Sequence, residues 1–213
     1  MKDQIVVNDI TLLQLDRPVE YNPHVIPACI PSPNLKVAPN TACWITGWGY
    51  ITEDALLSAP FRLQEAEVVI VEQAACEFIY QPPVGVQTSF ILKDSMICAG
   101  QYARDKAICR GDSGGPLVCK YGDAWNLIGL TSWSTPCSKP VGPSVFTRVT
   151  NFTGWIDEQK QENPTPNPTL APPQGPPPAI LSLTAHATRT LGVGVVLLAP
   201  QTFLLLPLLL GSL

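Results

Sequence analysis

The sequence predicts an all-β fold, an antiparallel β-barrel followed by a C-terminal helix. Short segments rich in β-branched and aromatic residues recur through the middle of the chain, and turn residues separate them. These segments do not alternate with helical patterns, as the strands of a parallel sheet do. Six of the seven cysteines lie in or beside the apolar segments, where strands would pack. The 213 residues are enough for one or two domains.

The first expected strand covers residues 8–15 and has the acidic Asp9 near its start. A proline-rich connector is predicted for residues 16–42, because six prolines interrupt any regular pattern there. The strands of the barrel are then expected at residues 43–49, 63–71, 95–100, 117–119, 125–133 and 145–149.

Two helices are expected beside these strands. Residues 72–80 predict a short helix, and residues 151–162 predict an amphipathic helix that closes the domain. The apolar face of the second helix would carry Phe152, Trp155 and Ile156.

The end of the chain differs in composition from the barrel. Residues 163–190 form a proline-rich linker, and residues 191–213 form an almost wholly apolar tail. Small residues around 182–187, a short spacer and the tail favour a GPI-attachment signal. A membrane-spanning helix is the alternative, but Pro200 and Pro207 interrupt the tail and no basic residue follows it. A disordered tail is the third possibility.

The segment that most strongly suggests catalytic chemistry is residues 109–117, Cys-Arg-Gly-Asp-Ser-Gly-Gly-Pro-Leu. Its three glycines allow backbone turns that a side chain would block. The N–H groups of Gly111 and Ser113 can then point at one spot and form an oxyanion hole. A serine hydroxyl is a poor nucleophile unless a base takes its proton, so the arrangement predicts Ser113 as an activated nucleophile. A neutral turn is the other interpretation of such a glycine-rich loop.

With the flanking cysteines, this loop resembles the nucleophile loop of the chymotrypsin and trypsin family of serine proteases. The resemblance runs from about residue 5 to about residue 160, and it looks closest to the membrane-anchored, trypsin-like group that includes testisin and prostasin. The motifs that carry it are Asp9-Ile10, residues 43–49 and 96–100, the Ser113 loop, Ser132-Trp133, and residues 145–149.

The resemblance implies a catalytic triad in the order His, Asp, Ser, in which Asp9 orients the histidine and Ser113 is acylated. No histidine precedes Asp9, and His24 lies in the connector, where a surface position is expected. Residues 1–42 would then be a remnant of the first of the family's two barrels plus the inter-barrel connector. Residues 43–162 would be the second barrel with its closing helix.

The resemblance also implies three disulfides and one unpaired cysteine. The unpaired residue would be Cys29, whose counterpart in many relatives bonds an upstream activation peptide. A zinc site is a poor alternative, since no Cys-x-x-Cys pair exists and His24 and His186 are far in sequence from any cysteine cluster; no metal or cofactor is expected. The implied pairs are Cys43 with Cys119, Cys76 with Cys98, and Cys109 with Cys137.

In the substrate pocket, trypsin-like relatives carry an acidic residue six positions before the serine, and Ala107 stands there. Asp105 could reach the pocket only through a shifted loop. Two wall positions that are usually glycine are Ser134 and Ser144, which would narrow the pocket beside Ser132 and Trp133. A desolvated cation without a partner is costly. Small or medium apolar P1 residues are therefore expected, and a degenerate pocket in a non-catalytic relative is the alternative.

In the family, the carboxylate at position 112 pairs with a new N-terminal amine that zymogen cleavage creates. This chain contains no such cleavage site. Met1 is a poor substitute, so Asp112 is expected to lack its partner and the oxyanion hole to be disordered.

The start of the chain has no apolar signal segment, which conflicts with the expected disulfides. We therefore expect that an N-terminal portion is missing from this sequence. The sequon at Asn151 fits N-glycosylation and a secretory route to the cell surface, GPI-anchored or membrane-bound, with an extracellular protein as the alternative. The net charge of −4, without a basic run, suggests no nucleic-acid partner.

Two classes of function remain. The first is a serine endopeptidase with protein or peptide substrates. The second is a truncated isoform or pseudoprotease that is inactive because the catalytic histidine is absent.

Overall fold

Six strands close into a barrel in which every neighbouring pair is antiparallel. The structure is a computed structural model that describes residues 6–15, 17–81, 92–164, 167 and 169, and the backbone of 195–199 and 202–204. The barrel confirms the all-β fold class. In the order in which they pair, its strands are β2 (Ala42–Gly47), β3 (Gln64–Val71), β4 (Met96–Gly100), β7 (Ser144–Arg148), β6 (Ala124–Ser134) and β5 (Pro116–Tyr121).

The barrel interior is filled by aliphatic and aromatic side chains from several strands. Leu117, Ile128 and Phe146 are fully buried, and they come from β5, β6 and β7. In β3, burial alternates along the strand, so that Ala66, Val68 and Ile70 point inward while Glu65 and Glu67 stay exposed. This period of two is what a strand with one buried face requires.

The hairpin of β5 and β6 is longer than the sequence predicted. Tyr121 pairs with Ala124 across a two-residue turn, and the first turn residue, Gly122, has a φ of 59°. Only glycine adopts this region at little cost. The strands can therefore continue two residues past the predicted end at residue 119, and β6 begins at Ala124 rather than 125.

Two α-helices pack on the barrel, α1 (Gln73–Tyr80) and α2 (Thr153–Glu162). The predicted second helix begins differently, since Val149–Phe152 forms a 3₁₀ turn, η1, before α2 starts. Ile156 is buried against β6, and Phe152 and Trp155 are partly buried in the same cluster. The predicted apolar face of this helix is confirmed.

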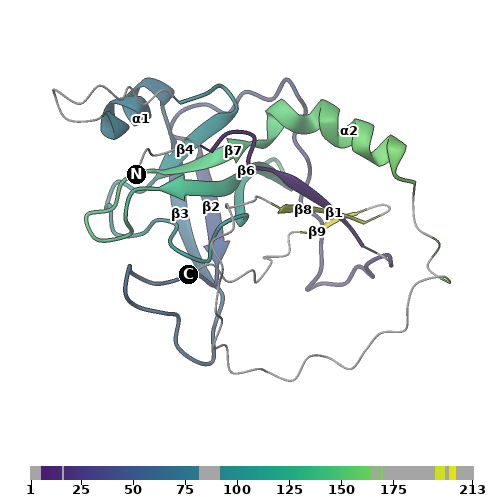
Figure 1. Ribbon diagram of the computed structural model, residues 1–213, viewed down its shortest axis with the longest axis horizontal. Helices are drawn as coiled ribbons and strands as arrows, with labels where there is room; N and C mark the ends of the chain where they lie inside the picture. Colours follow the sequence, from purple (N-terminus) through teal and green to yellow (C-terminus); the bar gives the residue numbers. More distant parts are fainter. Residues whose placement is uncertain are drawn as a thin grey trace.

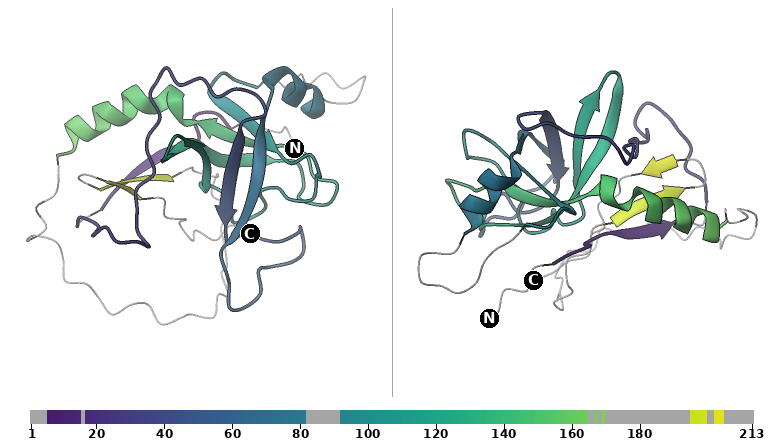
Figure 2. Two further views of the ribbon diagram at one scale, coloured as in Figure 1. Left: turned by 180° about the vertical axis from the view of Figure 1, so that it is seen from behind. Right: turned by 90° about the horizontal axis from the view of Figure 1, so that it is seen from above.

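Strand β1 (Thr11–Gln14) lies outside the barrel. It is shorter than the predicted 8–15 and pairs in parallel with β8 (Val195–Ala199), which in turn pairs with β9 (Thr202–Leu204). Figure 1 and the right panel of Figure 2 show this small sheet beside the barrel, on the side of α2.

The linker and tail predicted for residues 163–190 and 191–213 fall largely outside the described residues, as do residues 182–187. In the part of the chain that the structure describes, no helix is both long and apolar enough to cross a bilayer.

Three disulfides hold the barrel and its loops together, with the pairing that the family resemblance implied. Cys43–Cys119 joins β2 to β5 and is fully buried. Cys76–Cys98 fastens α1 to β4, and Cys109–Cys137 joins the Ser113 loop to the segment after β6. Cys29 is exposed and is not part of a disulfide.

Candidate active site

The Ser113 loop is a tight turn that leads directly into β5. Gly111 and Gly114 have φ angles of 89° and 78°, which a residue with a side chain rarely adopts. Backbone hydrogen bonds hold the loop against β6: the N–H of Gly114 donates to Thr131 O at 2.8 Å, and the N–H of Thr131 donates to Gly115 O at 2.8 Å. The glycines therefore give the loop its shape, and β6 fixes its position.

The side chain of Ser113 is exposed at the tip of this loop. Among the described residues, neither the N–H of Gly111 nor the N–H of Ser113 donates a hydrogen bond within the protein. Both donors are therefore open to a group that approaches Ser113 from outside.

Asp112, next to the serine, turns its carboxylate the other way. Its two oxygens accept the N–H groups of Gly49 and Cys109, each at 2.9 Å. A Cβ on Gly47 or on Gly49 would overlap this carboxylate, so only glycine leaves room for it. Desolvation by burial raises the pKa of Asp112, and the hydrogen bonds from Cys109 and Gly49 only partly oppose that effect.

A groove of about 300 Å³ borders the Asp112 carboxylate. Within the described residues Asp112 forms no ion pair, and Met1 lies outside these residues. The same groove is lined by Ala107 and by the exposed Asp105.

Asp9 is almost completely buried, with 6% of its surface exposed. The Ser132 hydroxyl of β6 donates to Asp9 Oδ2 at 2.6 Å, and the Thr147 hydroxyl of β7 donates to the Asp9 backbone carbonyl at 2.9 Å. Sequence analysis had placed Ser132 beside the substrate and had not selected Thr147. Their contacts with Asp9 span 123 and 138 residues of sequence, so no local sequence pattern could predict these contacts.

The two serines at the predicted pocket walls form different hydrogen bonds, one to another segment and one to the next residue. Ser144 is buried, and its hydroxyl oxygen accepts the N–H of Ile108, the neighbour of Ala107, at 3.3 Å. Ser134 donates to the carbonyl of Thr135 at 2.8 Å. Ala107 itself is half-buried and brings no charge to the region.

Tyr80 of α1 is a residue of this region that sequence analysis missed. Its ring meets Trp133 edge-on, with the ring centroids 4.9 Å apart. Its hydroxyl donates to Pro143 O and accepts the N–H of Thr135 at 3.2 Å. Tyr80 thus joins the two wall segments that carry Ser134 and Ser144.

The remaining predicted positions are His24, Asn151 and His186. His24 is exposed in a turn in which its N–H donates to Asn22 Oδ1 at 2.9 Å, as expected for a surface residue. Asn151 is exposed in η1. His186 lies outside the described residues.

Comparison with known proteins gives concordant matches. The Trypsin family model matches residues 2–156. Human Serine protease 41 is 36% identical over 167 residues, which are 78% of this chain and 52% of the relative. Human Testisin is 39% identical over 153 residues (70% and 47%), and mouse Tryptase is 41% identical over 151 residues (70% and 54%). The chain thus spans about half the length of these relatives.

Proposed function

The chain belongs to the trypsin family of serine proteases, and from this premise we propose that Ser113 is the nucleophile of a serine endopeptidase. The observation that carries the proposal is the geometry of the Ser113 loop. An exposed hydroxyl stands beside two N–H groups that donate to no other group in the described part of the chain. This is the arrangement that acyl transfer requires, because the donors must be free to receive the developing oxyanion.

In the proposed reaction, Ser113 Oγ attacks the carbonyl carbon of a peptide bond in a protein or peptide substrate. The N–H groups of Gly111 and Ser113 stabilise the negative charge that forms on the carbonyl oxygen. Collapse of this intermediate expels the amine and leaves an acyl-enzyme on Ser113, which water then hydrolyses.

The proposed base is a histidine that Asp9 orients. Buried and fixed by Ser132, the Asp9 carboxylate is suited to hold one imidazole tautomer and to offset the charge of the imidazolium. The two histidines of this sequence are His24 and His186, and the exposed turn around His24 does not fit the role. We therefore propose that a polypeptide segment outside these 213 residues supplies the histidine.

An amine is the proposed partner of Asp112. Its carboxylate borders a groove large enough for a short peptide end, and the raised pKa indicates that its charge lacks full compensation. A newly formed N-terminus bound there would stabilise the ionised form and would rigidify the loop that carries Gly111 and Ser113.

The substrate preference that we propose is for small or medium apolar P1 side chains. The position six residues before Ser113 holds the uncharged Ala107, and the serines at 134 and 144 take the place of smaller wall residues. A P1 arginine would lose its water without gaining a counter-charge.

We also propose a secretory route for this chain. Three disulfides are typical of an oxidising compartment. Further proposals follow from the same route: a glycan on Asn151, a disulfide from Cys29 to an upstream activation peptide, and a GPI anchor or membrane attachment through residues 191–213, with release to the extracellular medium as the alternative.

A second candidate function is a non-catalytic member of the family, such as a truncated isoform or pseudoprotease. The observation that favours it is the lack of any histidine among the residues that precede Asp9. Without a base, the Ser113 hydroxyl would stay protonated and unreactive.

Labelling by a fluorophosphonate separates the two candidates. We expect no labelling of the 213-residue chain alone above a Ser113→Ala control, because the base is not supplied. Protein isolated from its native source should be labelled on Ser113 if the protease proposal is right. Absence of label from both samples would favour the non-catalytic candidate. A non-reducing peptide map of the same native sample identifies what is bonded to Cys29.

A further inference from the structure

A short hairpin lies against the Ser113 loop. The N–H of Tyr50 donates to Arg110 O at 2.8 Å, and the hairpin closes through the N–H of Ile51, which donates to Ala55 O at 2.8 Å. Glu53 stands at the tip of this hairpin. The hairpin therefore places the Glu53 carboxylate beside the loops that contain Arg110 and Cys137.

Glu53 makes two contacts with those loops. Its Oε1 accepts the N–H of Cys137 at 2.6 Å, and its Oε2 lies 3.4 Å from Nη2 of Arg110. The Glu53 side chain is 26% exposed, whereas that of Arg110 is 62% exposed. A partly buried carboxylate bound to a backbone N–H is held far more firmly than a surface ion pair alone.

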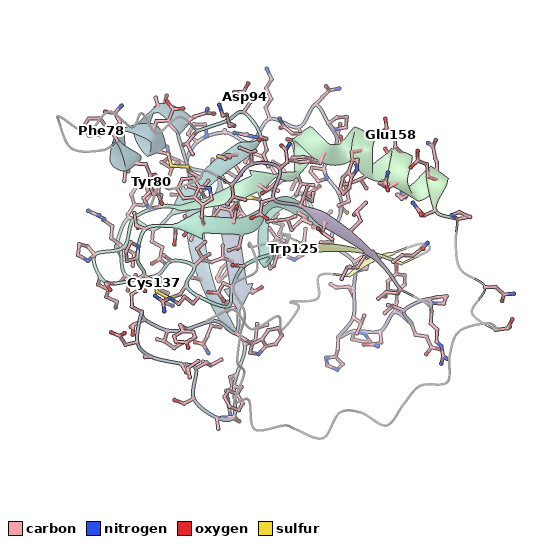
Figure 3. All side chains as sticks on the ribbon, in the orientation of Figure 1. Phe78, Tyr80, Asp94, Trp125, Cys137 and Glu158 are labelled. Carbon is pink, nitrogen blue, oxygen red and sulfur yellow. A yellow bond between two sulfur atoms is a disulfide. The ribbon has the colours of Figure 1, made fainter. Side chains whose placement is uncertain are left out.

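The same carboxylate lies over a disulfide. A Glu53 oxygen and the sulfurs of Cys109 and Cys137 all lie within 4.8 Å of one another. Figure 3 shows Cys137 with its sulfur–sulfur bond among the loops on the opposite side of the view from α2. Asp54, the next residue of the hairpin, is exposed, and in the described part of the chain it forms no hydrogen bond or ion pair.

Cys109 stands two residues before Gly111 and four before Ser113. Cys137 belongs to the segment that continues from the pocket wall at Ser134. The Cys109–Cys137 bond therefore ties the loop of the proposed oxyanion hole to a wall of the proposed substrate pocket. A contact that fixes this disulfide therefore also fixes the position of the Ser113 loop relative to the segment after Ser134.

We propose that Glu53 is a positioning residue for the Ser113 loop. Glu53 holds Cys137 and Arg110 in place, and its negative charge shields the Cys109–Cys137 disulfide. The link to catalysis rests on the proposed role of Ser113, but the hold on Cys137 and Arg110 and the shield do not. Their test therefore remains decisive even if Ser113 proves not to be a nucleophile.

The chemistry that the shield opposes is thiol–disulfide exchange with an external thiol. A thiolate attacks one cysteine sulfur, the S–S bond breaks, and its electron pair leaves on the other cysteine as a thiolate. A second external thiolate then attacks the mixed disulfide, releases the oxidised reagent and leaves both cysteines reduced. Because the attacking species is an anion, a carboxylate over the bond slows its approach.

The experiment compares the full chain with its Glu53→Gln and Asp54→Asn variants. Each is treated with 2-mercaptoethanesulfonate, 2-mercaptoethanol or cysteamine at equal thiolate concentration, so that the reagent tail is negative, neutral or positive. Alkylation and mass spectrometry then give the rate at which Cys109 and Cys137 become reduced. The buried Cys43–Cys119 bond serves as an internal control for unfolding.

We expect Glu53→Gln to increase the rate with the negative reagent about fourfold relative to the rate with cysteamine, because the two tails differ by two unit charges and lie about 10 Å from the carboxylate in water. Asp54→Asn, with the same loss of charge one residue away, should change that ratio by less than about 1.5-fold. Hydrogen exchange of the Cys137 N–H should also become faster in Glu53→Gln.

An equal acceleration for all three reagents, or none, would overturn the proposal, because loss of packing alone does not distinguish the sign of the reagent. The unmutated chain provides a second test if Glu53→Gln does not fold. Its preference for cysteamine over the negative reagent should shrink as salt is added, since ions screen the carboxylate. A preference that does not change with salt would equally overturn the shield.

Discussion

The Ser113 loop and the surroundings of Asp9, the two parts of the candidate site, are held in place in different ways. The Ser113 loop owes its shape to residues inside it, above all Gly111 and Gly114 with their positive φ angles. Asp9, in contrast, is held by Ser132 and Thr147, which lie more than a hundred residues further along the chain. The comparison shows that one half of the site is encoded locally and the other by the closure of the barrel.

The two parts also differ in their exposure to solvent. Ser113 is exposed, as the proposed nucleophile for a protein substrate has to be. Asp9 is 6% exposed, and burial strengthens each hydrogen bond that fixes its carboxylate. We therefore expect substitutions near Ser113 to act through the shape of the loop, and substitutions near Asp9 to act through the polar contacts of a buried charge.

The largest effect is expected from Gly47→Ala, which tests how β2 accommodates the Asp112 carboxylate of the Ser113 loop. The added Cβ would overlap the Asp112 carboxylate, and displacing that carboxylate breaks its hydrogen bonds with Gly49 and Cys109. We expect the free energy of unfolding to fall by about 3 kcal/mol, measured by urea denaturation of the chain.

A matched control for that experiment is Gly154→Ala in α2. A Cβ there meets no atom within 4 Å, and alanine favours a helix over glycine by up to about 1 kcal/mol. Gly47→Ala should therefore lower the free energy of unfolding, whereas Gly154→Ala should raise it. If both destabilise the chain to a similar extent, the fit of glycine around Asp112 does not shape the loop.

The same contrast explains what the sequence could predict. The Ser113 loop, its glycines and its flanking cysteines form a continuous string, so its chemistry could be inferred without coordinates. The barrel strands could be predicted because short segments rich in β-branched and aromatic residues stand between turn residues. Only their ends were wrong, as at the Gly122 turn, where a residue with positive φ lets the hairpin extend.

The parts that sequence analysis missed depend on contacts between distant segments. Neither Ser132 nor Thr147 differs in local pattern from other hydroxyl residues in strands. The role of Tyr80 could not be inferred either, because Tyr80 joins the segments of Ser134 and Ser144 only when α1 packs beside Trp133. Their roles follow from the pairing of β6 with β7 and from the packing of α1, and single-sequence patterns carry little information on either.

An intermediate effect is expected from Ser132→Ala, which tests how the closure of the barrel supports Asp9. The substitution removes the hydroxyl that donates to Asp9 Oδ2 at 2.6 Å and leaves a buried carboxylate less satisfied. A hydrogen bond to a charged group contributes about 2 kcal/mol, and we expect a loss of that size in urea denaturation. Ser138→Ala, at an exposed serine after the same strand, is the control. Equal effects of the two substitutions would contradict the assigned support of Asp9.

The smallest effect is expected from a pH series on Asp112→Asn, which asks whether the buried carboxylate of the loop carries a cost of its own. Desolvation raises the pKa of Asp112 above its ordinary value of 3.8, although the hydrogen bonds from Cys109 and Gly49 lower it in part. The folded chain therefore keeps a proton on Asp112 at a pH where the unfolded chain has already released it. By linkage, this group makes the fold less stable as the pH rises from its unfolded pKa through its folded pKa.

Asparagine does not titrate, so this contribution to the pH dependence should be missing from the variant. Between about pH 3 and about pH 7, the free energy of unfolding of Asp112→Asn should therefore rise relative to that of the unmutated chain. The same pH series on Asp123→Asn, in the exposed turn between β5 and β6, is the control for the loss of one carboxylate. A difference that falls with pH would mean that the carboxylate is stabilised when charged, and hence that the Ser113 loop already provides Asp112 with the compensation we assign to an external amine.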